Sequence, residues 1–153
     1  ENASFFAVSF DRHGSLGWKA SHIEDEDPGY DGAHVVEVLC ESVPQACLAY
    51  LHDRGVSCVF AGKDDMDMGL ALRKLREIFG IRRLLLEGGS VLNGAFLRAD
   101  LVDELSLVVM PVTGEDGDKS LFDNSVMRQF CLEDVQQLEG GVVWMRYRRV
   151  REK

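Results

Sequence analysis

The spacing of hydrophobic positions changes along the chain, and over the first half it predicts alternating strands and helices. Apolar runs rich in β-branched and aromatic side chains occupy residues 5–10, 35–40 and 56–61, and such runs are typical of strands. Residues 68–79 instead carry apolar side chains at mostly helical spacing. A proline suited to a first helical turn opens another predicted helix over residues 44–53.

Individual residues refine these boundaries. Asp67 is placed to cap the helix over residues 68–79, and Gly80 is placed to end it. Residues 11–14, with the sequence Asp-Arg-His-Gly, are typical of a turn after the first strand. We expect the chain to return from this turn as a short strand over residues 15–18.

The second half predicts a central strand, a helix, a further strand and a closing hairpin. Three consecutive leucines within residues 81–86 indicate a strand covered on both faces. A glycine pair then interrupts the pattern, residues 91–98 predict a helix, and residues 105–111 predict the next strand. Residues 130–138 and 142–150 alternate around Glu-Gly-Gly, which predicts a β-hairpin.

This order of elements determines the expected fold class. Alternating strands and helices imply an α/β fold, with a mainly parallel central sheet and helices on both faces. The hairpin adds an antiparallel edge at the C-terminal end. A chain of 153 residues fits one domain of ordinary size, so we expect residues 1–153 to form a single domain.

Charge and composition narrow the possible partners. The net charge of −9 repels phosphate backbones, so we expect no nucleic-acid partner. No apolar run approaches the roughly 20 residues of a membrane helix, so we expect no membrane partner. The four cysteines and four histidines lack the spacing of a metal site. We therefore expect reduced thiols, no metal and a cytoplasmic location.

The strongest chemical signal is the sequence LLLEGGSVLNG at residues 84–94. A predicted strand ends in Glu87 and two glycines, and a predicted helix follows at once. Ligands of open α/β sheets bind at the carboxyl ends of strands, and a helix start favours phosphate. Ser90 is expected either to cap this helix or to donate to a phosphate oxygen. A bare tight turn is the alternative, but a carboxylate after a buried strand is costly without a partner, which favours a ligand site.

The stretch over residues 81–111, IRRLLLEGGSVLNGAFLRADLVDELSLVVMP, resembles the signature region of the reductase domain of riboflavin-biosynthesis deaminase/reductases. That family shares the dihydrofolate-reductase-like fold. The resemblance implies an NADPH-dependent reductase similar to 5-amino-6-(5-phosphoribosylamino)uracil reductase. Such an enzyme reduces the ribosylamino side chain of a phosphorylated pyrimidine to a ribitylamino chain.

The same resemblance implies roles for the residues of the motif. Glu87 would be the catalytic residue, facing the cleft where cofactor and substrate meet. The related fold often has a cis peptide between its paired glycines. The cofactor pyrophosphate would be held by the backbone N–H groups around Gly88, Gly89, Ser90, Val91 and Leu92.

Further cofactor contacts are expected where two earlier strands end. In the related fold such strand ends meet the adenosine half of the cofactor. Ser42 follows one predicted strand and Gly62-Lys63 follows the next. Ser42 and Lys63 would receive a 2′-phosphate, whereas Glu41 would repel it if it points the same way. NADPH is therefore the expected cofactor, and NADH stays open.

Two features of the family are missing from this sequence. It contains no first strand with an SxDG-like motif, and it has no Lys and Arg cluster for a substrate phosphate near Glu87. We expect roughly 60 to 90 further residues upstream, from the usual size of such a domain. We also expect a homodimer formed through the apolar hairpin of residues 130–150. A same-fold reductase of a different small substrate and a non-catalytic binding module are the alternatives.

Overall fold

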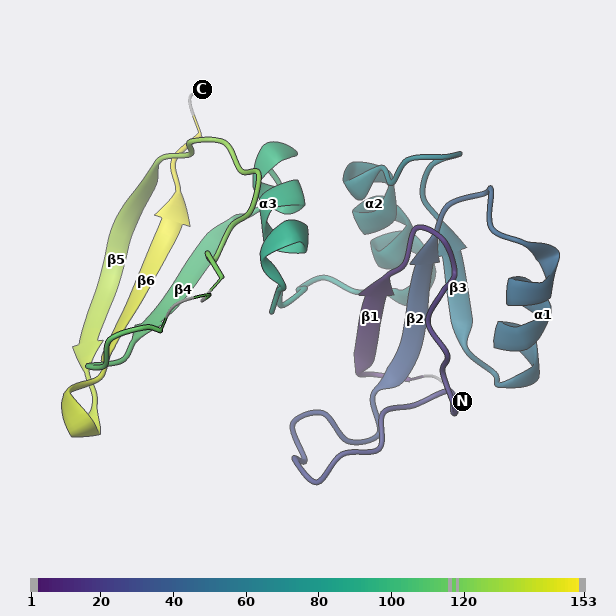
Figure 1. Ribbon diagram of the computed structural model, residues 1–153, viewed down its shortest axis with the longest axis horizontal. Helices are drawn as coiled ribbons and strands as arrows, with labels where there is room; N and C mark the ends of the chain where they lie inside the picture. The colour runs from purple at the N-terminus through teal and green to yellow at the C-terminus, as the bar shows by residue number, and fades with distance from the viewer. Residues whose placement is uncertain (1–2, 116, 118, 152–153) are drawn as a thin grey trace. The chain divides into compact units, whose positions relative to one another are not determined.

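The computed structural model describes residues 3–115, 117 and 119–151, and its chain divides into two compact units (Figure 1). The first unit is Glu1–Arg83 and the second is Leu84–Lys153. No helix among the described residues is both long and apolar enough to cross a membrane.

The first unit is built around a parallel three-stranded sheet. Its strands are β1 (Phe6–Phe10), β2 (His34–Leu39) and β3 (Ser57–Phe60), in the order β1-β2-β3. Two helices connect and follow the strands, α1 (Gln45–Asp53) and α2 (Met68–Phe79). The predicted strand–helix alternation of the first half is therefore confirmed.

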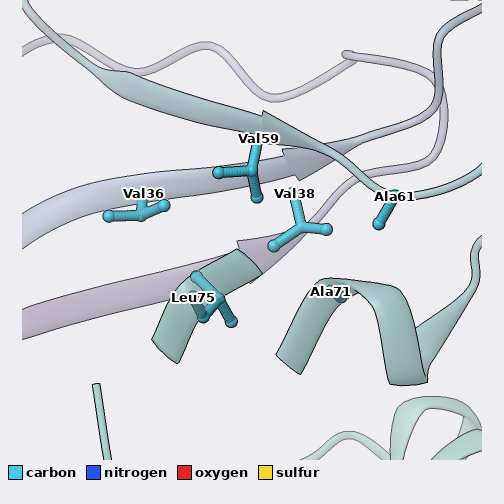
Figure 2. Close-up of a cluster of buried hydrophobic side chains, with 6 residues drawn as sticks. All are labelled: Val36, Val38, Val59, Ala61, Ala71 and Leu75. Carbon is cyan, nitrogen blue, oxygen red and sulfur yellow. The ribbon is translucent and has the colours of Figure 1, made fainter. Parts of the chain in front are cut away.

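One helix packs against each face of this sheet. Successive residues of a strand point to opposite faces, so neighbouring residues of β2 contact different helices. Figure 2 shows the face toward α2, where Val36 and Val38 of β2 lie in one buried cluster with Leu75 of the helix. On the other face, Val35 packs with Leu51 of α1 in a second buried cluster. The predicted covering of the parallel sheet by helices on both faces is confirmed.

The boundaries of α2 follow from its capping residues. The side chain of Asp67 accepts a hydrogen bond of 2.8 Å from the backbone N–H of Leu70. Gly80 ends the helix with φ at 70°, a left-handed conformation that glycine adopts without a steric cost. Both predicted caps are confirmed.

The strand predicted over residues 15–18 does not form. The backbone N–H groups of Ser15 and Leu16 donate to the carboxylate of Asp11 instead. Because these N–H groups already donate hydrogen bonds within the loop, they are not available to pair with a neighbouring strand. Residues 11–18 are therefore a loop folded around one buried carboxylate.

The second unit contains an antiparallel three-stranded sheet. Helix α3 (Ser90–Arg98) precedes β4 (Glu104–Val109), and β5 (Phe130–Gln137) pairs with β6 (Val143–Arg149) across the short 3-10 turn η1 (Glu139–Gly141). The strand order is β4-β6-β5. The predicted hairpin is confirmed, and β4 is joined to it as a third antiparallel strand.

Two expectations for the middle of the chain are wrong. Residues 81–86 form no strand, and no strand in the described part of the chain pairs with them. Leu85 is 75% exposed, so the leucine run is not covered on both faces. Strand β4 is antiparallel rather than a parallel neighbour, and its alternation of exposed Glu104 with half-buried Leu105 is typical of a sheet with one solvated face.

Candidate functional site

The glycine pair before α3 has the backbone geometry that the sequence predicts. Gly88 has φ at 107°, and the peptide bond between Gly88 and Gly89 is cis. Gly89 is the N-cap of α3, and no side chain makes a capping hydrogen bond there. Ser90 is the first residue of the helix, so its expected role as the cap is wrong.

Gly89 borders open space. A Cβ built on Gly89 would meet no described atom within 4 Å, whereas one on Gly88 would meet the side-chain amide of Asn93 at 3.6 Å. The first N–H groups of a helix have no partner inside the helix and carry its positive dipole end. Ser90, Val91 and Leu92 place these groups directly after the open glycine, so an anion can approach the backbone here.

Glu87 is an exposed residue directly before the cis peptide. Its carboxylate is thus presented at the same turn as the helix start. A carboxylate can accept hydrogen bonds from substrate hydroxyls, and the adjacent N–H groups can receive an anion. Of the predicted site residues, the structure brings together Glu87 and the run from Gly88 to Leu92.

The position of α3 depends on contacts that the sequence pattern did not reveal. The side-chain amide of Asn93 donates to the carbonyl of Leu121 at 3.0 Å, and the N–H of Asp123 donates to the carbonyl of Ser90 at 3.0 Å. A Cβ on Gly94 would come within 1.8 Å of the Asp123 carbonyl oxygen. These contacts with residues 121–123 hold the first turns of α3, and no local sequence pattern reveals them.

A second cluster lies in the first unit, where β2 and β3 end. The N–H of Ser42 donates to the carbonyl of Lys63 at 3.1 Å, and the N–H of Glu41 donates to the carbonyl of Gly62 at 3.0 Å. Gly62 has φ at 106°, and a Cβ there would lie 1.9 Å from the carbonyl oxygen of Asp65. The structure therefore brings Ser42, Gly62 and Lys63 together, and Gly62 is required by the turn itself.

Arg12 belongs to this second cluster and was missed by the sequence analysis. Its Nε donates to the carbonyl of Asp64 at 2.7 Å, and its guanidinium forms an ion pair with Asp65 at 2.8 Å. The available signal was a basic residue directly after the first strand. Arg12 and Lys63 supply positive charge at these strand ends, and Glu41 and Asp65 supply negative charge there.

The predicted site residues, together with Arg12, thus form two clusters, one in each unit. The glycine cluster consists of residues 87–92 in the second unit. The strand-end cluster consists of Arg12, Ser42, Gly62 and Lys63 in the first unit. The glycine cluster offers backbone donors to an anion, and the strand-end cluster offers charged and hydroxyl side chains.

Comparison with curated proteins finds relatives among pyrimidinone phosphate reductases. The chain is 40% identical over 82 residues to 2,5-diamino-6-ribosylamino-4(3H)-pyrimidinone 5′-phosphate reductase of Methanothermobacter thermautotrophicus, covering 54% of this chain and 37% of that protein. The reductase of the same name from Aquifex aeolicus is 32% identical over 80 residues, covering 52% and 35%. The chain therefore spans about a third of the length of the curated relatives it matches.

Comparison with solved structures supports the fold. A pyrimidine reductase-like protein from Corynebacterium diphtheriae matches with a TM-score of 0.73 at 18% identity, covering 95% of this chain and 61% of that one. RibD from Acinetobacter baumannii matches with a TM-score of 0.69 at 24% identity, covering 94% and 37%. The predicted dihydrofolate-reductase-like fold is confirmed. The pattern of the RibD C-terminal domain matches residues 32–144, and the chain belongs to this family.

Proposed function

We propose that this chain is part of an NADPH-dependent reductase that acts on a phosphorylated pyrimidine carrying a ribosylamino side chain. The observation that carries the proposal is the glycine cluster, where Glu87 precedes an open glycine and a helix start. The membership of the chain in the RibD C-terminal domain family supports it. The curated relatives are named as reductases of such a compound.

The residues of the glycine cluster fit a dinucleotide. The backbone N–H groups of residues 88–92 would hold the pyrophosphate, because they lie at a helix start that no side chain caps. The open space beside Gly89 leaves room for the approach. The nicotinamide would supply the hydride, and this chain would supply binding, orientation and electrostatics.

The strand-end cluster fits the adenosine half of a dinucleotide cofactor. Arg12 and Lys63 would attract a 2′-phosphate, and the hydroxyl of Ser42 would donate to it. Glu41 opposes this charge if it points toward the phosphate. Parallel titrations with NADPH and with NADH measure whether attraction of the 2′-phosphate outweighs its repulsion by Glu41. Weaker binding of NADPH than of NADH would contradict the proposed 2′-phosphate site.

Glu87 would act on the substrate rather than on the cofactor. A carboxylate accepts hydrogen bonds from ribosyl hydroxyls and orients the carbon that receives the hydride. The two curated relatives are named for a diamino-pyrimidinone, whereas the compound expected from the sequence is an amino-uracil. Both carry a ribosylamino chain with a 5′-phosphate, so we propose this shared part as the recognised feature.

We propose further that both units belong to one reductase domain. The family match runs from residue 32 to residue 144 and therefore includes residues of both units. Limited proteolysis with and without NADPH tests this proposal. Protection of both units by the cofactor is expected, and protection of one unit alone would contradict it. The cytoplasmic location stays a prediction.

The variant Gly89→Val tests the proposed function directly. The added side chain would occupy the open space beside the helix start, so the affinity for NADPH should fall at least tenfold, which corresponds to about 1.4 kcal/mol. Isothermal titration calorimetry measures this affinity. Gly29→Val is the matched control, because Gly29 lies in an exposed loop of the first unit. Unchanged NADPH affinity in Gly89→Val would overturn the proposal.

A further inference from the structure

Glu37 is a carboxyl-bearing residue in the middle of a buried strand, and the proposed function does not use it. It is 0% exposed. It lies between Val36 and Val38, whose side chains face α2 in Figure 2. Because successive strand residues point to opposite faces, Glu37 points to the α1 face. Its neighbours on that face include Val35 and Leu39, so the carboxyl group lies within an apolar cluster.

Two other polar side chains are buried on the same face. Ser9 of β1 is the ladder partner of Glu37, and Trp18 packs against the α1-facing cluster. The Ser9 hydroxyl, the Trp18 indole N–H and both Glu37 carboxyl oxygens are buried, and within the described part of the chain none of them makes a hydrogen bond of ordinary geometry. Such groups are rare and costly in proteins. Asp11 and Trp18 nevertheless lie close enough to the Glu37 carboxyl group to shift its pKa. If Glu37 is protonated, these donors and acceptors complement one another directly or through one bridging water.

Asp11 lies beside Glu37 and is in the opposite charge state. Burial opposes its charge, but hydrogen bonds from the backbone N–H groups of Leu16, His13 and Ser15 outweigh burial and lower the pKa of Asp11. Burial, followed by the nearby Asp11, raises the pKa of Glu37 to about 7. Between pH 3.8, the ordinary pKa of an aspartate, and about pH 7 the pair therefore holds one negative charge on Asp11 and one proton on Glu37.

The remaining titratable groups near Glu37 leave that proton in place. Cys47 on α1 and Cys58 on β3 face it, and burial is the main cause that raises the pKa of each thiol, so both are neutral. Tyr50 on α1 packs in the same cluster, and its hydroxyl donates to the backbone carbonyl of Trp18 at 2.8 Å. Asp11 is thus the charged group that acts on Glu37.

The loop of residues 11–18 is attached at both ends. At its start, Arg12 donates to the carbonyl of Asp64 and pairs with Asp65. At its end, Trp18 accepts the hydrogen bond from Tyr50 of α1. We propose that Glu37 is an uncharged positioning residue whose buried carboxylic acid, with Ser9 and Trp18, holds this loop on the sheet and so fixes Arg12 in the strand-end cluster.

This role has a consequence for stability that can be worked out in sign. The ordinary pKa of a glutamate is 4.5, and that of folded Glu37 is about 7. Between these pH values the unfolded chain releases the proton before the folded one, so the folded state loses stability as pH rises. Above pH 7 the folded state also ionises and the loss levels off. A negative Glu37 beside Asp11 should then loosen the loop.

Thermal unfolding of the full chain from pH 5 to pH 8.5 tests the proposal without any cofactor. Glu37→Gln keeps the shape and cannot ionise, so its unfolding midpoint relative to wild type should rise with pH, by about 2–4 °C or more at pH 8. Glu77→Gln, the same change at an exposed position of α2, should differ from wild type in its unfolding midpoint by an amount that does not change with pH. The proposal would be overturned if the difference in unfolding midpoint between Glu37→Gln and wild type were also independent of pH.

Amide hydrogen exchange reports the loop itself. In the wild type, exchange at Ser15 and Leu16 should speed up above pH 7 beyond the intrinsic pH effect, and in Glu37→Gln it should not. If Glu37→Gln fails to fold, the proposal is tested in the unaltered chain by following the ¹³C chemical shift of the Glu37 carboxyl group as pH changes. A midpoint well above 4.5 supports the proposal, and an ionised Glu37 at pH 5.5 contradicts it.

The positioning of Arg12 for the cofactor rests on the proposed function, so it is tested by a separate measurement, the affinity for NADPH. NADPH affinity should weaken above pH 7 in the wild type and stay level in Glu37→Gln. If the loop responds as described but NADPH does not bind at any pH, the proposed function fails and the role of Glu37 in the loop stands. If NADPH binds with the same pH dependence in both proteins, Glu37 does not position Arg12.

Discussion

Three glycines, two in the clusters and one just after the glycine cluster, differ in what a side chain would meet. A Cβ on Gly62 would lie 1.9 Å from the carbonyl oxygen of Asp65, and one on Gly94 would lie 1.8 Å from that of Asp123. These glycines are required by the fold itself. Gly89 meets no described atom within 4 Å and has φ at −69°, a conformation open to any residue. No packing contact accounts for Gly89, and this supports the pyrophosphate site proposed above.

Glu87→Gln should fold normally, bind NADPH with little change and lose turnover. A hydrogen bond to a charged group contributes about 1.5–3 kcal/mol, so we expect kcat/KM to fall on the order of 10–100-fold. Steady-state oxidation of NADPH with the ribosylamino-pyrimidine phosphate measures this. Glu77→Gln is the matched control on an exposed helix face. Wild-type turnover in Glu87→Gln would make the role of Glu87 structural.

At the residue scale, the sequence singled out the glycine pair before α3 but missed the parts played by Gly94, Arg12 and Glu37. Gly88 and Gly89 stand out because they follow an apolar run and precede a helical pattern. Gly94 is explained by a contact with a residue 29 positions later, which no local pattern contains. Glu37 lies in a run of β-branched residues, and only the packed sheet shows that its carboxyl group is buried.

At the element scale, local capping signals determined how well each boundary was predicted. The helix over residues 68–79 was predicted to the residue, because Asp67 and Gly80 mark both of its ends. The strand predicted over residues 81–86 does not form, because a strand depends on hydrogen-bonded neighbours that composition alone does not specify. The same limit applies to β4, whose partner β6 lies about 40 residues further along.

Gly94→Ala tests how α3 is held in place. The added methyl group would collide with the backbone of Asp123, so the free energy of unfolding should fall by roughly 1–3 kcal/mol. Gly69→Ala in α2 is the matched control, because its Cβ would come no closer than 3.4 Å to its neighbours. That change should be neutral or stabilising by up to about 1 kcal/mol. Equal effects of the two changes in urea unfolding would contradict the role of Gly94.

At the scale of the whole molecule, the antiparallel sheet carries exposed apolar side chains. Val108 of β4 is 59% exposed, and Leu132 and Val135 of β5 are 48% and 54% exposed. By contrast, Trp144 is engaged within the sheet, since its indole N–H donates to the Ser106 hydroxyl at 2.7 Å. Exposed apolar surface on a sheet with open edges is usually covered, which supports the proposed homodimer.

Light scattering at micromolar concentration should give twice the mass of the chain. Val135→Lys should reduce the mass to that of a monomer, because it places a charge among the exposed apolar side chains of β5. Val112→Lys is the control, since Val112 is 76% exposed and lies outside the strands. A monomer mass for the unaltered chain would contradict the dimer.

The central claim is that a nicotinamide dinucleotide binds with its pyrophosphate at the start of α3. A crystal structure of the chain soaked with NADPH tests it most directly. We predict pyrophosphate oxygens within hydrogen-bonding distance of the backbone N–H groups of residues 88–92. A pyrophosphate bound elsewhere, or no bound NADPH at millimolar concentration, would contradict the account.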